Sequence, residues 1–401
     1  MTDDAVGRRP DDDEDLGLSL VRGDALYRAQ RAIGLIPARG LGLGRRALLL
    51  ALVTWAPTAV WALLVNRALP GVAGEPLLQH FGIHVRCLVA IPLLVIAEGM
   101  AHAVTLRIVP YFVASGLVRE RDVPAFRKVV HGVVALRDST RPWIVLLGIL
   151  AAWTYLTPIA ADVHEVVWAS ETGEASAHAG FGAFWFLYVA RPVYFALLLS
   201  WVWRVLLLFV LLARIARLEL ALVPSHPDGA SGLAFLEGLP AAFSLVALAS
   251  STVIASRWAH DVVYHGVHVD SLRLPAIALL VVNVLLFTGP LLAFVPKLAP
   301  LKRAALLQYG ALVGSQGRLV HRRWIEGDAS IGDEPVLSAP EIGPVADANA
   351  LYEAVARSRT MLVGKRALLP IVVPTALPLL AVFAIEVPVK ELLMKLLTTL
   401  A

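Results

Sequence analysis

Residues 182–212 read GAFWFLYVARPVYFALLLSWVWRVLLLFVLL, and this stretch decides the fold class. Only Arg191 and Arg204 are charged among its 31 residues. About 20 consecutive apolar residues suffice to cross a bilayer as an α-helix. The stretch therefore predicts a transmembrane helix that tilts or extends beyond the bilayer, with a kink at Pro192.

Six further stretches have the same apolar character, and the whole composition agrees with them. They cover residues 47–66, 86–106, 142–161, 240–260, 274–296 and 367–385. Hydrophobic residues make up 58% of the chain and charged residues 16%, whereas a soluble domain has about 25% charged residues. The sequence predicts an all-α, polytopic membrane helix bundle with about seven transmembrane helices.

The lysines and arginines between the stretches indicate the orientation. Of the 35 in the chain, 27 lie in the first, third, fifth and seventh flanking segments. The alternate segments hold five, with Arg86 at the membrane boundary included. Because cytoplasmic loops retain positive charge during insertion, the amino terminus is expected inside and the carboxyl terminus outside. The net charge of +4 is then a matter of topology and requires no nucleic-acid partner.

Four regions follow from this topology. The single cysteine, Cys87, excludes an intrachain disulfide, and the polar first 46 residues lack a signal peptide, so the first span is expected to remain. High Ala, Leu, Val and Arg content is typical of a bacterial protein, which predicts a multi-pass protein of the bacterial inner membrane. The first region is a cytoplasmic tail at 1–46, with a disordered acidic start and an interfacial helix at 18–35. The second contains transmembrane helices 1–6 at 47–297, with a helical cytoplasmic loop at 107–141. A small helical cytoplasmic portion at 298–366 follows, and the last region, 367–401, contains transmembrane helix 7 and an outer interfacial helix. No internal repeat is apparent on inspection.

Charged residues inside the spans are the first candidates for function, since each costs about 2.5–3.5 kcal/mol at mid-bilayer. Glu98 and His102 are one turn apart on one helix face and indicate a cation or proton site. Arg191 and Arg204 in the fourth span are further candidates. The alternative is a structural ion pair, such as Glu98 with Arg204.

A proline series marks the last span. Pro370, Pro374 and Pro378 each lack the N–H that would bond the carbonyl four residues before. The carbonyls of Arg366, Pro370 and Pro374 are therefore available on one face, where they can line a cation path. A kinked, tightly packed helix is the alternative.

Seven of the eleven histidines fall on the predicted outer side, namely His80, His84, His164, His178, His260, His265 and His268. His260, Asp261, His265 and His268 lie close together and are candidate ligands of a transition metal. The alternatives are a sensor of external pH and a solvated loop.

The most motif-like segment on the predicted inner side is Val-Pro-Ser-His-Pro-Asp-Gly-Ala-Ser-Gly-Leu at 223–233. His226 and Asp228 can exchange a proton or bind a metal, whereas the residues Asp228, Gly229 and Gly232 also suit a turn and a helix cap. With Gly42–Leu48 and Arg86–Glu98, this motif resembles a family of bacterial multi-pass inner-membrane proteins. Ser225 and Ser231 depart from the family's usual threonine and glycine. The resemblance implies a membrane location and no particular activity.

Three functions remain open from the sequence. The leading one is an ion or small-solute channel or transporter, with a homo-oligomer as a possible assembly. The second is a membrane-embedded enzyme that acts on a lipid substrate, with or without a bound metal. The third is a non-catalytic membrane scaffold or sensor. The sequence requires no cofactor, and the only partner that it implies directly is the lipid bilayer.

Overall fold

The structure is a computed structural model, which describes residues 17–37, 40–69, 76–156, 168, 180–328 and 343–386. Regular structure within these ranges is helical, and the extended pairing there is a single bridge between Val118 and Leu220. Six helical segments are long and apolar enough to cross a membrane: Leu43–Leu64, Phe81–Ala114, Phe181–Ala216, Ala234–His265, Val269–Ile325 and Lys365–Ile385. These features confirm the prediction of an all-α polytopic membrane bundle.

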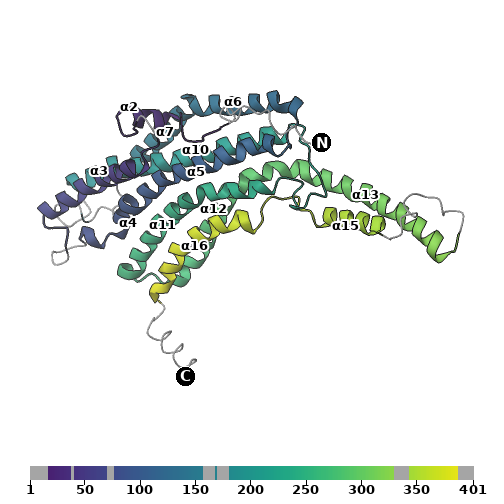
Figure 1. Cartoon of the computed structure of the whole chain (residues 1–401). Helices are drawn as coiled ribbons and strands as arrows, with labels where there is room; N and C mark the ends of the chain where they lie inside the picture. The colour runs from purple at the N-terminus through teal and green to yellow at the C-terminus, as the bar shows by residue number, and fades with distance from the viewer. Residues whose placement is uncertain are drawn as a thin grey trace, which may run out of the picture.

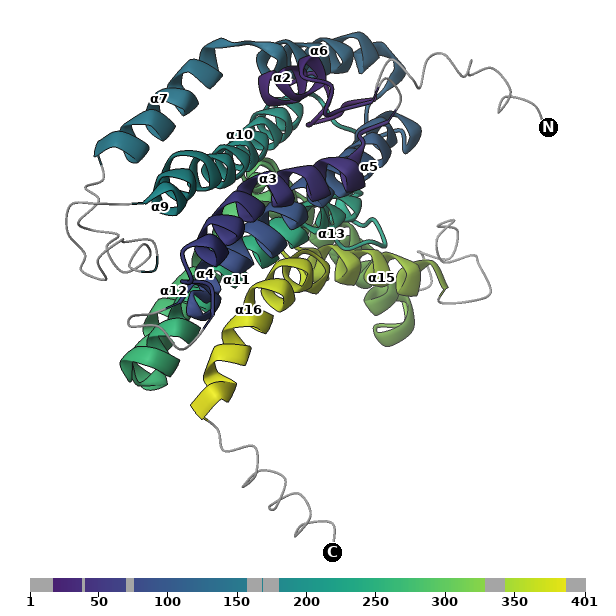
Figure 2. The ribbon, with the colours of Figure 1, turned by 90° about the vertical axis from the view of Figure 1, so that its left-hand side faces the viewer.

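The expected third span appears as α7 (Arg141–Leu156), an apolar helix shorter than the other six. In Figure 2, α7 lies to one side of the bundle, next to α10 (Arg191–Ala216). The remainder of that expected span lies outside the described residues. So do the acidic start, the outer interfacial helix, His164 and His178.

Two of the spans repeat one local structure, which inspection of the sequence missed. One runs through α4 (Phe81–Val85), η2 (Arg86–Ala90) and α5 (Ile91–Ala114), and the other through α9 (Phe181–Trp185), η6 (Phe186–Ala190) and α10. In both, five α-helical residues precede a five-residue π-helical turn and an α-helix with proline as its second residue. The sequences FGIHVRCLVAIP and FGAFWFLYVARP, 100 residues apart, share Phe, Gly, Val, Ala and Pro at five of twelve positions.

The prolines explain the π-helical turns. Pro92 and Pro192 donate no hydrogen bond, and their rings would collide with the carbonyl four residues earlier in a regular α-helix. The preceding residue instead bonds five residues back, Ile91 to the Arg86 carbonyl and Arg191 to the Phe186 carbonyl. This wider turn makes room for the proline ring, so each helix continues where it would otherwise kink or end.

The carboxyl-terminal half combines a hairpin with a projecting arm. From η7 (Ala234–Phe243) the chain enters α11 (Ser244–His265) and returns through η8, α12, η9, α13 and η10. Their bounds are Val269–Leu272, Arg273–Thr288, Gly289–Phe294, Val295–Val320 and His321–Ile325. Figure 1 shows α13 leaving the bundle with α15 (Gly343–Arg357) alongside it, and α16 (Lys365–Glu386) running back along α11.

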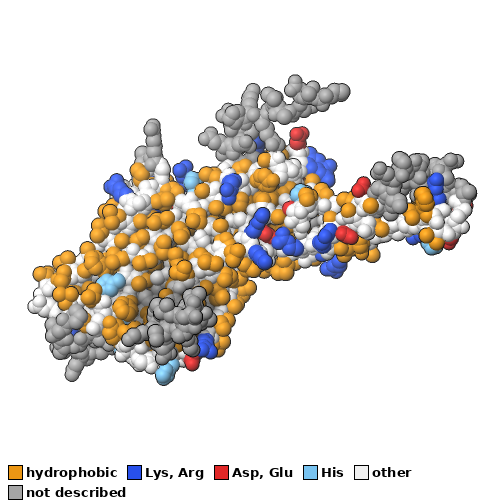
Figure 3. Space-filling view, turned by 60° about the horizontal axis from the view of Figure 1, so that its bottom comes forward, with side chains coloured by type: hydrophobic (Ala, Val, Ile, Leu, Met, Phe, Trp, Pro, Cys, Tyr) orange, Lys and Arg blue, Asp and Glu red, His pale blue; other side chains and the backbone are white. Residues whose placement is uncertain are grey.

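The surface agrees with this division. On the face in Figure 3, hydrophobic side chains cover the bundle, while Lys and Arg side chains gather where the arm begins. Exposed aliphatic side chains such as Leu285 on α12 and Leu377 on α16 are those expected to face lipid.

The segment before the first span packs into the bundle. It contains α2 (Ala25–Ala32), shorter than the expected helix at 18–35. Leu18, Leu20 and Val21 precede α2 and are fully buried in the same hydrophobic core as residues of α5 and α10. Arg137 of α6 (Val123–Asp138) donates a hydrogen bond to the Ser19 carbonyl. This N-terminal segment, residues 17–37, therefore forms part of the folded core.

Candidate functional site

Glu98 lies between two arginines in the interior of the bundle. Its Oε2 is 2.6 Å from Nη1 of Arg46, which is in the first turn of α3 (Leu43–Leu64). Its Oε1 is 3.0 Å from Nη2 of Arg204 on α10. All three side chains are 1% exposed. The ion pair between Glu98 and Arg204 that the sequence offered as an alternative is thus present, with a second arginine added.

The N-terminal segment supplies the remaining groups. Asp24 Oδ2 is 2.9 Å from Arg204 Nη2, and Asp24 Oδ1 accepts a 2.6 Å hydrogen bond from the Tyr27 N–H as the N-cap of α2. Gln30 Oε1 accepts a 2.7 Å hydrogen bond from Arg46 Nε. The loop before α2 and the first turn of α3 are thereby bound to two membrane helices. Asp24, Arg46, Glu98 and Arg204 are called the charge cluster below.

The charge cluster is formally neutral, with two carboxylates and two guanidinium groups. Taking charges out of water is costly, and hydrogen-bonded opposite charges offset that cost only while the set is complete. Glu98 lies 17 residues into the segment that begins at Phe81, about 26 Å along a helix. Together with the position of Arg46 at the start of α3, this places the cluster near one boundary of the bilayer, away from its centre.

Arg204 is the incompletely satisfied member of the cluster. Its Nη2 contacts both carboxylates, but its buried Nε and Nη1 have no hydrogen-bond partner within the described part of the chain. The guanidinium carbon lies 4.7 Å from the ring centroid of Trp201. A buried unsatisfied donor costs about 1–3 kcal/mol. These N–H groups can therefore gain from an oxygen atom of water or of an anionic solute.

The other predicted permeation residues lie apart from one another. His102 Nδ1 is 2.9 Å from Ser19 Oγ, so its contact is with the N-terminal segment. Arg191 precedes Arg204 by 13 residues, about 20 Å along α10, and its guanidinium carbon is 5.9 Å from the ring centroid of Phe195. The structure joins Glu98 to Arg204 but separates both from Arg191.

The proline series lies in α16, which remains helical through Pro370, Pro374 and Pro378. The helix packs along α11, where Ser251 Oγ donates a 2.9 Å hydrogen bond to the Thr375 carbonyl. Thr375 is fully buried, whereas Pro370 and Pro374 are half-buried. This contact is one of helix packing.

Several described histidines near the other end of the bundle pack against one another. Among the described residues, no three His, Cys, Asp or Glu side chains are arranged to hold a metal ion, which includes the predicted set His260, Asp261, His265 and His268. The rings of His80 and His260 stack at 5.1 Å, and His265 lies 5.2 Å from His260. Ring packing and the 3.0 Å contact between His260 Nδ1 and the Gln79 carbonyl both contribute to these positions.

His84 has both ring nitrogens occupied. Trp55 Nε1 lies 2.9 Å from His84 Nδ1, and His84 Nε2 lies 3.0 Å from the Leu77 carbonyl. An indole N–H can only donate and a carbonyl can only accept, so the proton of the neutral imidazole is on Nε2. His84 thus joins α3 to the loop before α4.

The turn that contains His226 and Asp228 is closed by the Asp228 carboxylate, whereas the N-cap position of the following helix η7 is Leu233. Asp228 accepts hydrogen bonds from the N–H groups of Ala230, Gly232 and Ala234 at 2.8, 3.1 and 3.0 Å. His226 Nδ1 is 2.9 Å from Asp228 Oδ1. Burial alone would raise the pKa of the Asp228 carboxyl, but these three N–H groups and the imidazole bring it below its usual value.

The two glycines of this turn have backbone conformations that favour glycine. Gly229 and Gly232 have φ of 65° and 96°. The Gly229 carbonyl also accepts a 2.8 Å hydrogen bond from the Arg359 N–H, which attaches the segment before α16. The turn thus positions two chain segments, and its carboxylate is already engaged by backbone donors.

Sequence reasoning missed Asp24, Gln30 and Arg46 because it searched for charges only inside the expected spans. A usable signal was the apolar run of Leu18, Leu20 and Val21 directly before Asp24, which is unusual in a solvated tail. No protein-family model, curated protein or solved structure matches this chain. The function is therefore argued from the site alone.

Proposed function

We propose that this protein is a transporter or channel of the bacterial inner membrane, with its amino terminus in the cytoplasm, that moves an ion or small solute past the charge cluster. The observation that supports it is Arg204, a fully buried cation beside Glu98 whose Nε and Nη1 have no hydrogen-bond partner among the described residues. Internal repeats are common in transport proteins, and this bundle contains a repeated local structure in two of its spans.

In the proposed mechanism, the contact between Asp24 and Arg204 closes the path. Asp24 occupies one side of Arg204 and is delivered by the N-terminal segment, which covers this end of the bundle. An anionic solute that bonds Nε and Nη1 of Arg204 would share the guanidinium charge with Asp24, which is bound to Nη2, and would weaken the attraction between Asp24 and Arg204. Displacement of Asp24 would release the segment and open the path, while Glu98 keeps Arg46 and Arg204 in place.

The test is flux into liposomes that contain the purified full-length protein. Potassium, sodium, proton and chloride gradients are compared for the wild type, Glu98→Asp and Glu98→Gln. Glu237→Gln is the matched control, since Glu237 is also buried and pairs with an arginine, Arg359, at 2.7 Å. Selective flux that falls in Glu98→Gln, in protein shown to be folded and inserted, but not in Glu237→Gln supports the proposal. Absence of flux for every ion, in protein shown to be folded and inserted, contradicts it.

A scaffold role has one observation in its favour, the projecting arm. Trp324 and Ile325 on η10 are 63% and 73% exposed, and the guanidinium carbon of Arg323 lies 5.8 Å from the ring centroid of Trp324. Exposed aromatic and basic side chains are enriched in protein interfaces. A protein that cross-links to wild-type membranes, but not after Trp324→Ala, would favour this second role.

A further inference from the structure

A contact between Ser19 and His102 fastens the N-terminal segment to α5. His102 Nδ1 lies 2.9 Å from Ser19 Oγ. Ser19 is 6% exposed and lies between Leu18 and Leu20, which are fully buried. Asp24 of the charge cluster follows five residues later. The contact therefore lies at the base of the segment that delivers Asp24 to the cluster.

The other hydrogen bonds of Ser19 decide which atom of this contact carries the proton. Ser19 Oγ accepts hydrogen bonds from the N–H groups of Val21 and Arg22, at 3.3 and 3.0 Å. A hydroxyl group has two acceptor lone pairs and one proton. Since both lone pairs are occupied, the hydroxyl proton is the group left to bond His102, and Nδ1 accepts it. His102 is therefore neutral, with its own proton on Nε2.

Protonation of His102 would break this hydrogen bond. An imidazolium carries an N–H on each ring nitrogen, so Nδ1 would become a donor that faces an oxygen with no lone pair left. Arg22 interacts electrostatically with His102 and would repel the imidazolium. Because Ser19 is buried, water has little access to replace the lost partner. His102 itself is only half-buried, so protons can reach it.

The nearby groups on α6 and η7 have partners of their own. Arg137 of α6 donates a hydrogen bond to the Ser19 carbonyl, and its Nε lies 2.8 Å from Asp138 Oδ1. Glu237 of η7 pairs with Arg359 at 2.7 Å. The carboxylates of these two elements are thus committed to arginines and do not offset a charge on the imidazole.

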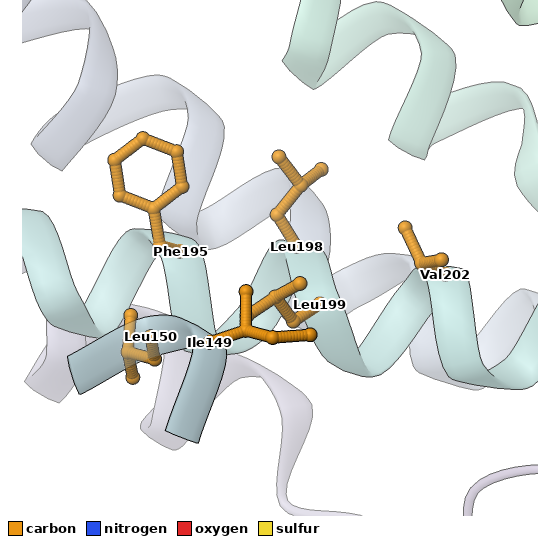
Figure 4. Close-up of a pocket in the computed structure, with 6 residues that line it drawn as sticks. All are labelled: Ile149, Leu150, Phe195, Leu198, Leu199 and Val202. Carbon is orange, nitrogen blue, oxygen red and sulfur yellow. The ribbon is translucent and has the colours of Figure 1, made fainter. Parts of the chain in front are cut away.

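The same holds for α3, α5 and α10. Glu98, one turn before the imidazole on α5, is bound between Arg46 and Arg204. On the side of α10 that faces α7, Figure 4 shows a pocket of about 240 Å³ whose lining side chains are all apolar. That lining adds no titratable group. The surroundings therefore favour the neutral form of His102 while the segment is bound.

We propose that Ser19 and His102 form a pH-sensitive clasp, which holds the N-terminal segment on the charge cluster at neutral pH and releases it when the cytoplasm becomes acidic. Because the bound segment requires the neutral imidazole, the released state binds a proton more tightly. Binding of the segment is thus complete above a pH of about 6.5, where a free imidazole titrates, and weakens as the pH falls below it. An effect of this release on flux rests on the proposed transport function, whereas the release itself does not.

The experiment measures the distance between two spin labels by double electron–electron resonance, in full-length protein in liposomes at pH 7.5 and pH 5.5. The labels are attached to Ile33→Cys and Leu307→Cys, at positions 73% and 78% exposed, in a Cys87→Ala background. His102→Gln retains an acceptor oxygen for the Ser19 hydroxyl but does not titrate. The matched control is His226→Gln, which removes a 43% exposed histidine on the predicted inner side. Circular dichroism establishes that each variant is folded.

The wild type is expected to show one main distance at pH 7.5 and a second, released population at pH 5.5. The ratio of the second to the first should rise about tenfold, as for an equilibrium linked to one proton over one pH unit below about 6.5. His226→Gln should respond as the wild type does, and His102→Gln should keep the first distance at both pH values. A wild type without a pH response, or an equal response in His102→Gln, would overturn the clasp.

Ser19→Ala provides a second test that does not depend on the folding of His102→Gln. It removes the hydroxyl group, so the released population should be present at both pH values with little change between them. A pH response equal to that of the wild type would again overturn the clasp.

Flux measured on the same liposomes separates this inference from the transport proposal. A label distance that responds to pH, in protein that moves no ion, supports the clasp and contradicts the transport proposal alone. A label distance that does not respond to pH contradicts the clasp, whatever the flux.

Discussion

Replacement of Glu98 by glutamine is expected to destabilise the protein more than any other single isosteric change in the charge cluster. Glu98 contacts both Arg46 and Arg204, so Glu98→Gln leaves two buried guanidinium groups opposite Asp24 alone. The glutamine amide has only one acceptor oxygen. Its NH₂ group is a donor and would face the N–H donors of the second arginine. Removal of one partner from a buried ion pair costs about 3–5 kcal/mol.

The assay is thermal unfolding of the purified protein in detergent, followed by tryptophan fluorescence. A loss of about 3–5 kcal/mol corresponds to a fall in Tm of about 5–10 °C for a large domain. Glu353→Gln is the control, because Glu353 forms an exposed pair with Arg357 that contributes only about 0.3–0.5 kcal/mol. A Tm for Glu98→Gln that equals the Tm of this control would refute the argument.

A second arm of the same experiment separates charge balance from packing. Arg46→Met combined with Glu98→Gln removes one positive and one negative group and restores neutrality in the cluster. The double variant is expected to be more stable than the sum of the single losses, by about 1–3 kcal/mol. Strict additivity would mean that the two groups do not interact and that the cluster acts only by filling space.

Two further predictions concern other parts of the fold. The lowered pKa of the Asp228 carboxyl means that its ionised form stabilises the native state at pH values above the unfolded pKa, and this stabilisation is lost as the pH falls through the lower folded pKa. Asp228→Asn should therefore remove part of the acid sensitivity seen in unfolding scans between pH 6 and pH 3. A pH profile identical to that of the wild type would contradict this. Gly182→Ala should reduce the free energy of unfolding by about 1–3 kcal/mol, because the new Cβ would lie 2.4 Å from a ring carbon of Trp61. Gly82→Ala, at the equivalent position of the repeat, is the control, since its Cβ meets nothing within 4 Å and should leave the free energy of unfolding unchanged. Equal effects of the two variants would contradict this packing.

Much of the fold follows from the sequence because membrane helices obey a local rule. An apolar run of sufficient length must satisfy its backbone hydrogen bonds internally, so it becomes a helix wherever its neighbours lie. The ends of α7 and of the continuous helical segment from α12 through α13 were harder to predict from the sequence, because they depend on contacts with other helices. The pairing of Glu98 with Arg204 could be named as one alternative, because both lie inside spans.

The contribution of the N-terminal segment could not be derived in the same way. Asp24 and Gln30 lie in a stretch rich in arginine, and local pattern alone assigns such a stretch to the membrane surface. Their burial depends on Arg46 and Arg204, which are 16 and 180 residues away from Gln30 and Asp24 respectively. Contacts at that separation are set by tertiary packing, which no hydrophobic pattern encodes.

The repeated π-helical turns also bear on how the chain originated. In each copy the repeated segment follows an apolar helix, α3 before α5 and the shorter α7 before α10. Duplication of a two-helix unit returns the chain to the side from which it started, so the second copy inserts with the same polarity as the first. A unit with an odd number of crossings would have been inverted and would have needed its loop charges reversed. Through Glu98 and Arg204, the charge cluster joins one copy of the repeated structure to the other.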